Sequence, residues 1–156
     1  DFEGEIVLVI GKAGRHIPDA EAMSHVAGYS ILMDGSVRDY QKHSVTAGKN
    51  FDRSSAFGPW MVTADAILDP GAMRLTTTLN GSLMQSTTFE RLMWTPAAIV
   101  HYVSTFTELQ PGDAIATGTP AGVGHRRTPP VFMKAGDRLE VAVSGIGVLA
   151  NTVQDE

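Results

Sequence analysis

The 156-residue sequence contains no cysteine. Disulfide bonds, thiolate nucleophiles and sulfur-based metal sites are therefore excluded, whereas carboxylate chemistry stays open. The sequence also has no basic block, and its formal net charge is -5, so neither nucleic acid nor an anionic membrane surface is expected as a partner. No apolar run approaches the roughly 20 residues that a membrane-spanning helix needs.

Several motifs of known enzyme classes are missing as well. Ser54-Ser55 lacks the Gly-x-Ser-x-Gly elbow of many serine hydrolases. The five histidines have no zinc-ligand spacing, although His43 and His125 stand in polar segments where either could serve as a catalytic base. The glycine-rich segment 117–124 lacks the end of a Walker loop, but it could aim a hydroxyl and backbone N–H groups at a ligand carboxylate.

The length and composition predict one globular domain over residues 1–156. The chain is long enough for one hydrophobic core and too short for two typical domains. A hydrophobic content of 43%, with 16 glycines and 8 prolines, indicates a folded, turn-rich protein. Because the sequence starts at Asp1 rather than Met, we expect it to be part of a longer protein whose N-terminal segment is missing here.

The first ten residues contain an apolar strand and two acidic residues on which the functional prediction depends. Residues 6–10 are five apolar residues, mostly β-branched, and are followed by glycine, which is typical of a strand buried on both faces. Glu3 and Glu5 precede this run and point to the same face of the strand. Two carboxylates so close repel each other unless a cation lies between them or one binds a proton. A solvated strand start is the simpler alternative.

The rest of the chain is read as mostly strands with one main helix, a β-rich α+β fold. Thr95 as N-cap and Pro96 at the first helical position predict a helix through about residue 105. Asn80-Gly81 predicts a two-residue hairpin turn between strands 74–79 and 83–85. We expect one or two helical turns over residues 19–26 with Asp19 as N-cap, and one helical turn at most within residues 37–46. The remaining expected elements are strands at 28–33, 60–63, 114–117, 138–143 and 148–153, and a loop at 48–55.

Asp34 ends the strand predicted at residues 28–33 and adds a third carboxylate to Glu3 and Glu5. Three oxygen ligands without cysteine suit a hard divalent ion, Mg²⁺, Mn²⁺ or Ca²⁺. Taken singly, an aspartate before glycine is typical of a plain turn. Arg38 and Lys49 suggest an anion-binding pair, with Arg38 holding a carboxylate and Lys49 placed near a developing oxyanion. Solvated surface cations are the alternative for both.

These segments together resemble the fumarylacetoacetate hydrolase family, over nearly the whole chain. Glu3-Gly4-Glu5 before an apolar strand resembles the first sequence block of that family. Four further blocks follow in the expected order, at residues 28–41, 48–59, 109–124 and 136–151. The segment 86–93 departs from the serine- and threonine-rich turn, ending in Asp-Met, that many relatives have at this place, so the pocket wall there is expected to differ.

The resemblance implies a mixed β-sandwich roll, the fold of that family, in a cytoplasmic enzyme that forms a homodimer. It implies an ion, Mg²⁺ or else Mn²⁺ or Ca²⁺, held by three carboxylates: Glu3, Glu5 and Asp34. It also implies a small oxo-acid substrate, bound by side chains that match substrate-site positions of the family: Arg38, Gln41, Lys49 and Thr119. Lys49 and Arg38 are the expected catalytic residues. Relatives also supply a His–Glu pair from an N-terminal lid, so the general base is not assigned from this sequence.

The reaction that we predict first is hydrolysis of a C–C bond in an acylpyruvate or fumarylpyruvate type of diketo acid. The ion would chelate the keto acid and stabilise the enolate that forms when the bond breaks. An alternative is isomerisation or decarboxylation of a 2-oxo or 2-hydroxy dicarboxylic acid in aromatic catabolism, which uses the same ion and the same anion-binding residues. A third alternative is a non-catalytic domain that binds a carboxylated metabolite or Ca²⁺.

Overall fold

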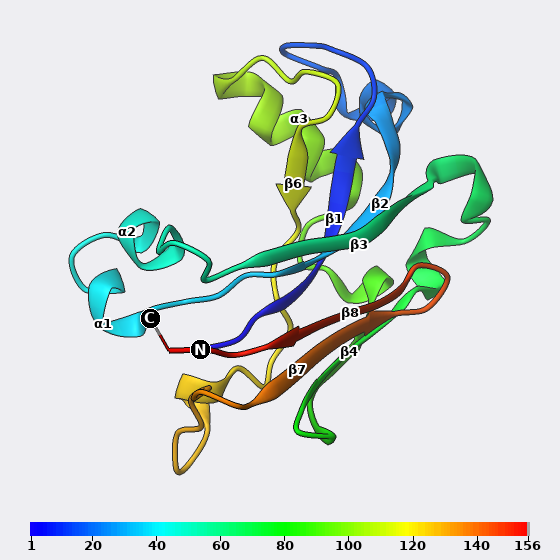
Figure 1. Cartoon of the computed structure of the whole chain (residues 1–156). Coiled ribbons are helices and arrows are strands. Elements are labelled where there is room, and N and C mark those ends of the chain that lie inside the picture. Colours follow the sequence, from blue (N-terminus) through cyan, green and yellow to red (C-terminus); the bar gives the residue numbers. More distant parts are fainter. Residues whose placement is uncertain (156) are drawn as a thin grey trace.

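The computed structural model describes residues 1–155 and contains two four-stranded sheets (Figure 1). The first sheet has the order β3-β2-β1-β6, with strands β1 (Gly4–Ile10), β2 (Val26–Met33), β3 (Ala56–Thr63) and β6 (Ala114–Ala116). The second sheet has the order β5-β4-β7-β8, with strands β4 (Arg74–Leu79), β5 (Ser82–Thr88), β7 (Arg138–Val143) and β8 (Gly147–Thr152). Neighbouring strands pair antiparallel in both sheets.

One long helix and several short ones connect the strands. The α-helices are α1 (Arg38–Gln41), α2 (Val45–Lys49) and α3 (Pro96–Phe106). The 3-10 helices are η1 (Asp19–His25), η2 (Ala64–Ala66), η3 (Pro70–Ala72), η4 (Phe89–Arg91) and η5 (Gly124–Arg126). Helix α3 starts as predicted, because the Thr95 hydroxyl accepts a hydrogen bond from the Ala98 N–H at 3.1 Å. The predicted fold class, a β-rich α+β roll with one main helix, is confirmed.

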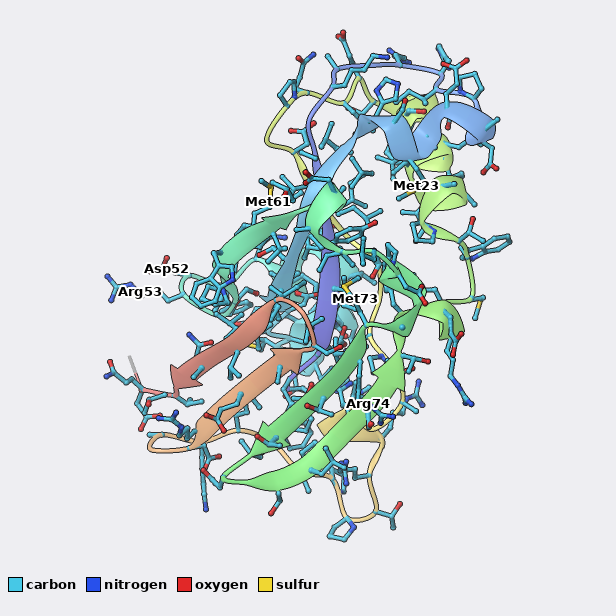
Figure 2. The ribbon with its side chains drawn as sticks, turned by 90° about the vertical axis from the view of Figure 1, so that its right-hand side faces the viewer. Met23, Asp52, Arg53, Met61, Met73 and Arg74 are labelled. Atoms are coloured by element: carbon cyan, nitrogen blue, oxygen red, sulfur yellow. The ribbon has the colours of Figure 1, made fainter. Side chains whose placement is uncertain are left out.

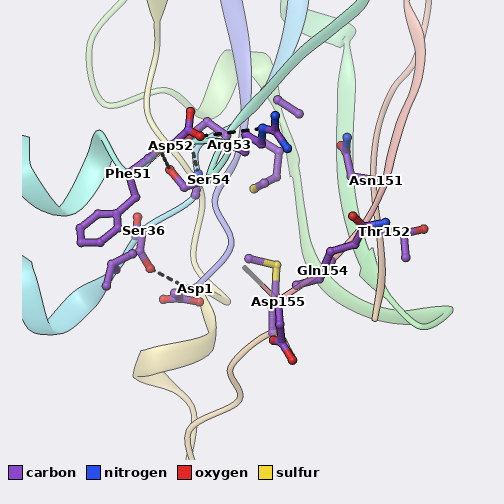
Figure 3. Close-up of a pocket in the computed structure, with 17 residues that line it drawn as sticks. Asp1, Ser36, Phe51, Asp52, Arg53, Ser54, Asn151, Thr152, Gln154 and Asp155 are labelled. Carbon is purple, nitrogen blue, oxygen red and sulfur yellow. Dashed lines mark hydrogen bonds and ion pairs between the residues drawn. The ribbon is translucent and has the colours of Figure 1, made fainter. Parts of the chain in front are cut away.

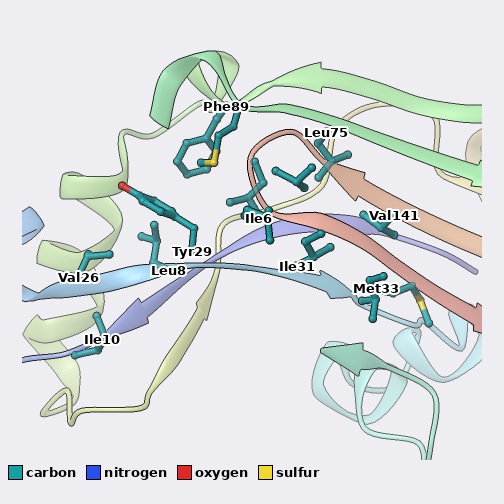
Figure 4. Close-up of a cluster of buried hydrophobic side chains, with 14 of the residues drawn as sticks. Ile6, Leu8, Ile10, Val26, Tyr29, Ile31, Met33, Leu75, Phe89 and Val141 are labelled. Carbon is teal, nitrogen blue, oxygen red and sulfur yellow. The ribbon is translucent and has the colours of Figure 1, made fainter. Parts of the chain in front are cut away.

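The hydrophobic core lies between the two sheets, which face each other (Figure 4). Ile6 and Leu8 of β1 and Ile31 of β2 face Leu75 and Val141 of the second sheet, and all five are at most 2% exposed. Val7, between Ile6 and Leu8, points to the opposite face of β1 and is also buried, at 1% exposed, so β1 is apolar on consecutive positions rather than alternating. At one end of the core, the rings of Tyr29 and Phe89 meet edge to face with centroids 6.1 Å apart.

The local predictions succeed where the turn chemistry is strong. The Asn80-Gly81 hairpin is confirmed, since Leu79 pairs with Ser82 and both turn residues have positive φ. The Asp19 N-cap is wrong: Pro18 occupies the cap position, makes no side-chain bond, and is followed by a 3-10 helix. The loop expected over residues 48–55 is wrong in part, because Ser44 caps α2 by accepting from the Ala47 N–H and the helix extends to Lys49. Strand β3 begins at Ala56 rather than Trp60.

Side chains occupy the space between the sheets, whereas the loop after α2 projects outward (Figure 2). Met73 is 3% exposed in the core, while the side chains of Asp52 and Arg53 are 89% and 93% exposed. Across residues 1–155, no helix combines the length and apolar character that crossing a lipid bilayer requires.

Candidate functional site

The pairing of β1 with β2 brings the predicted acidic residues together. Gly4 of β1 pairs with Met33 of β2, so the start of one strand lies beside the end of the other. The backbone N–H of Asp34, the residue after β2, donates to the Glu3 carbonyl at 2.8 Å. Carboxylates that lie 31 positions apart in the sequence thus become neighbours. The alternative in which Asp34 is only a turn residue therefore does not account for its contact with Glu3.

A third segment reaches the same place from the other edge of β1. Strand β6 pairs with β1 only from Val7 to Val9, and the chain then continues along β1 toward its start. Gly118, with φ +101, turns its backbone N–H toward the Glu5 carboxylate and donates to it at 2.8 Å. A positive φ is adopted without strain by glycine, which explains this residue at the turn.

Glu3, Glu5 and Asp34 form a compact acidic cluster. One oxygen from each carboxylate lies within 4.8 Å of the others, and Glu3 and Glu5 are 8% and 4% exposed. Among residues 1–155 these are the acids that meet in such a group. Three anions in this volume need compensating positive charge, because burial weakens the solvent screening of their repulsion.

Lys49, at the end of α2, lies between two of the three acids. Its ammonium group donates to Glu3 Oε2 at 2.7 Å and also contacts an Asp34 carboxylate oxygen. Burial lowers the pKa of Lys49, but the hydrogen bonds to Asp34 and Glu3 outweigh burial and leave the pKa above its ordinary value. The surface interpretation of Lys49 is therefore wrong, since its side chain is 21% exposed and paired twice.

Arg38, at the start of α1, is held on three sides. Its Nε donates to Asp1 at 2.8 Å, one terminal nitrogen donates to Glu3 at 2.5 Å, and the other donates to Gln41 at 3.0 Å. The nitrogen that contacts Glu3 also lies 2.7 Å from Asp1. Because the guanidinium group has five N–H donors, the second N–H of the nitrogen that contacts Gln41 is left available to a ligand. Gln41 thus lies in the site, where its contact in this structure is to Arg38.

Asp1 was not among the predicted site residues. Its side chain is 0% exposed and accepts hydrogen bonds from the Gly124 and His125 N–H groups at 2.8 and 3.1 Å. The His125 ring also contacts this carboxylate at 3.0 Å. Burial, together with the Arg38 and Arg126 charges, lowers the pKa of His125. An isolated Asp at a chain start carries no sequence signal for this role, because its partners come from two distant loops.

Within the acidic cluster, Glu5 is the acid that forms no ion pair with a cation of the described chain. Its Oε2 accepts from Gly118, whereas Lys49 and Arg38 bind the other two acids and Asp1. Burial, followed by the charges of Asp34 and Glu3, raises the pKa of Glu5 to about 7 against the opposing Gly118 hydrogen bond. The buried Glu5 carboxylate is therefore stabilised by binding either a cation or a proton.

Thr119 lies beside the cluster, but its hydroxyl has internal partners. It donates to the Gly4 carbonyl at 3.0 Å and accepts from the Gln85 amide at 2.8 Å. Gln85 reaches this position from β5 of the second sheet and was not predicted as a site residue. The predicted contact of Thr119 with substrate stays a prediction.

Two cavities border this region. The larger, about 610 Å³, runs between the loop after α2 and the end of β8, with Asp1 and Ser36 in its wall (Figure 3). The smaller, about 330 Å³, has Gly118 and Thr119 on one side and Phe89 and Leu92 on the other. The loop that contacts Glu5 is therefore also the wall of a partly apolar cavity.

Comparison with known proteins identifies the family. The sequence profile described as "Fumarylacetoacetate (FAA) hydrolase C-terminal" matches residues 1–154. The chain belongs to this family. A relative in Bos taurus, "Oxaloacetate tautomerase FAHD2B, mitochondrial", is 41% identical over 98% of this chain and 50% of its own length.

Solved structures of family members share the fold. A fumarylacetoacetate hydrolase from Exiguobacterium antarcticum is 42% identical, with a TM-score of 0.95 over 99% of this chain and 56% of its own. A fumarylpyruvate hydrolase from Pseudomonas aeruginosa, solved with Mn²⁺ and pyruvate, is 34% identical, with a TM-score of 0.89 over 99% of this chain and 66% of its own. The chain thus spans about half the length of the curated relative and somewhat more of the two solved structures.

The acidic cluster has the properties that a hard divalent ion requires. Its donors are carboxylate oxygens, which such ions prefer. One oxygen from each acid lies in a single small volume, and the buried Glu5 carboxylate has no cation of its own among residues 1–155. The residues therefore fit such an ion, and an ion there would be held by Glu3, Glu5 and Asp34.

The raised pKa of Glu5 predicts an unusual dependence of stability on pH. In the folded protein Glu5 keeps its proton up to about pH 7, whereas its ordinary pKa is 4.5. Because the folded state then binds more protons than the unfolded state, the free energy of unfolding should fall as pH rises through this range, by at most about 1.4 kcal/mol per pH unit. Adding Mn²⁺ should raise Tm more at about pH 8 than at about pH 5, because the ion binds the ionised carboxylate.

Thermal denaturation across this pH range, with and without Mn²⁺, measures both effects. Glu5→Gln should flatten the metal-free profile and reduce the Mn²⁺ shift. Glu108→Gln removes an exposed carboxylate outside the cluster and serves as the control. An unchanged profile in Glu5→Gln would show that Glu5 is not the titrating group.

Proposed function

We propose that this chain carries the catalytic site of a divalent-metal-dependent enzyme that interconverts the keto and enol forms of a small 2-oxo dicarboxylic acid such as oxaloacetate. The observation that carries the proposal is the placement of the Lys49 ammonium directly against the cluster of Glu3, Glu5 and Asp34. An ion held there would act as a Lewis acid toward the keto oxygen of the substrate.

The residues of the chain have separate roles in this proposal. Lys49 donates a hydrogen bond to the oxygen on which negative charge develops as the enol proton leaves and carbon 3 takes up a proton. Arg38 binds a substrate carboxylate with the N–H that Asp1, Glu3 and Gln41 leave available, and its fixed position orients the substrate. The Arg38 contacts are present before substrate arrives, so this side chain needs little reorganisation. Lys49 would exchange its carboxylate contacts for the substrate oxygen when the ion binds.

Hydrolysis of a C–C bond in an acylpyruvate or fumarylpyruvate type of diketo acid is the second candidate. Relatives named for tautomerisation and for hydrolysis are equally similar to the chain, at 41% and 42% identity, so the choice rests on the site. Both reactions need enolate stabilisation, but hydrolysis also needs a water molecule and a base that activates it. The positions of Lys49 and Arg38 support enolate stabilisation, which both reactions need. They therefore favour keto–enol interconversion, the reaction that needs no activated water.

A direct assay separates the two reactions. With Mn²⁺ or Mg²⁺ present, we expect accelerated ketonisation of enol-oxaloacetate and little cleavage of acetylpyruvate or fumarylpyruvate. Activity should disappear with a chelator and return when the ion is restored. Fast cleavage of a diketo acid with no effect on oxaloacetate would reverse the assignment in favour of the hydrolase. Ion binding without any turnover would leave a metabolite- or Ca²⁺-binding domain.

Replacement of Lys49 tests its proposed role. Lys49→Met should lower kcat about 100-fold, as expected for removal of one oxyanion donor. Affinity for Mn²⁺ should be retained or increased, because the ammonium group and the ion compete for the same carboxylate oxygens. Lys42→Met, at an exposed lysine that pairs with Asp39, is the matched control and should leave kcat unchanged. A kcat within twofold of wild type in Lys49→Met would remove Lys49 from the mechanism.

We also propose that two copies of the chain associate and that the enzyme is cytoplasmic. Exposed apolar side chains on β3, at Phe57, Trp60 and Met61, support the first point, because such groups collect at interfaces. Sedimentation should give twice the mass of the chain, and the Trp60→Glu variant should shift it toward the monomer.

A further inference from the structure

We propose that Gln85 is a positioning residue, which holds the metal-binding and substrate-binding sides of the site in register through Gly4 and Thr119. The inference rests on the proposed function and extends it to a residue of the second sheet. Gln85 touches neither the acids nor the expected position of the substrate. Its effect would reach the acids through the Gly4 backbone, and the substrate through Thr119, which is predicted to contact it.

Each polar atom of the Gln85 side chain has a partner from the site. Gln85 is 1% exposed. Its Oε1 accepts from the Gly4 N–H at 3.0 Å, and its Nε2 donates to Thr119 Oγ1 at 2.8 Å and to the Pro120 carbonyl at 2.9 Å. One amide therefore connects the residue between Glu3 and Glu5 with the loop that contacts Glu5.

These hydrogen bonds take the place of backbone pairing at one edge of β1. On one edge β1 pairs with β2 along its whole length, but on the other edge β6 pairs only from Val7 to Val9. Thr117 still bonds the Ile6 carbonyl, and beyond it no strand of the described chain pairs with Gly4 on this edge. The Gly4 N–H binds the Gln85 amide, and the Gly4 carbonyl binds the Thr119 hydroxyl. Two side chains thus complete the hydrogen bonding of the strand edge where the acidic cluster begins.

The second sheet approaches Gly4 so closely that a side chain there would force its neighbours to shift. A Cβ atom at this position would lie 2.3 Å from Thr77 Oγ1 and 3.4 Å from Gln85 Oε1. Thr77 and Gln85 are paired neighbours on β4 and β5. The missing side chain is therefore what allows an amide of the second sheet to reach the backbone between the two glutamates.

The partners also fix which chemical group is needed. The Gly4 N–H requires an acceptor, whereas the Pro120 carbonyl requires a donor. Thr119 uses its hydroxyl proton on the Gly4 carbonyl, so it too requires a donor from position 85. An amide offers one acceptor and two donors in this arrangement, and an ionised carboxylate offers acceptors alone.

Two variants at Gln85 separate its acceptor contact with Gly4 from its donor contacts with Thr119 and Pro120. Gln85→Met keeps the approximate length but loses all three hydrogen bonds, so we expect Mn²⁺ affinity to fall about tenfold and KM to rise. Gln85→Glu, measured at about pH 8, keeps an acceptor for Gly4 and loses the donors. We therefore expect Gln85→Glu to retain Mn²⁺ affinity within about threefold while KM for the oxo acid rises about tenfold. Titration calorimetry with Mn²⁺ and steady-state kinetics give the two readouts.

Thr77→Val is the matched control, because Thr77 lies in the same buried layer and its hydroxyl has no partner among residues 1–155. It should keep wild-type Mn²⁺ affinity and KM. Wild-type values of both quantities in Gln85→Met, whatever its Tm, would overturn the proposal and leave the proposed function standing. If Gln85→Met fails to fold, the test rests on Gln85→Glu. A fall in Mn²⁺ affinity as large as the rise in KM in this variant would overturn the proposal. A wild-type protein that neither binds Mn²⁺ nor turns over an oxo acid would overturn both proposals.

Discussion

Mutual repulsion among Glu3, Glu5 and Asp34 is the constraint on which the arrangement around β1 depends. Three carboxylates with oxygens inside 4.8 Å, two of them nearly buried, are stable together only with compensation. The fold supplies it unevenly: Lys49 serves two acids, Arg38 serves Glu3 and Asp1, and Glu5 receives only a backbone N–H. The remaining imbalance is concentrated on one buried carboxylate, and it is this imbalance that makes the cluster suited to a cation.

The sheet architecture determines that imbalance. Antiparallel pairing of β1 and β2 places Asp34 beside Glu3, and the early end of β6 leaves room for the 117–120 loop on the other edge. Helices α1 and α2, which follow β2 directly, bring Arg38 and Lys49 back over the same acids. Each side chain of the proposed site therefore lies within a few residues of a strand end or on a one-turn helix. Strand β2 and the 117–120 loop are hydrogen-bonded to the β1 backbone, whereas α1 and α2 reach the site through the Arg38 and Lys49 side chains.

How far the sequence predicts this structure depends on the range of the interactions. Local signals were sufficient for β1, the Asn80-Gly81 hairpin and the Thr95-capped helix, because caps and tight turns act over a few residues. Family resemblance supplied the acids, Arg38 and Lys49 as a set, which single-residue reasoning left open against ordinary surface roles. Asp1 and Gln85 were missed because their partners lie 123 and 81 positions away in the chain. Helix α2 was missed because Gly48 and the surrounding polar residues are typical of a loop.

The Lys49 ammonium has a consequence for how the proposed ion would bind. A tethered cation already compensates two of the three acids, Glu3 and Asp34, without any divalent ion. Loading of the proposed ion would then be an exchange of one counter-ion for another at these two carboxylates. Such a site would sample the prevailing metal pool repeatedly during the lifetime of the protein, so that the ion it carries reflects supply as much as selectivity.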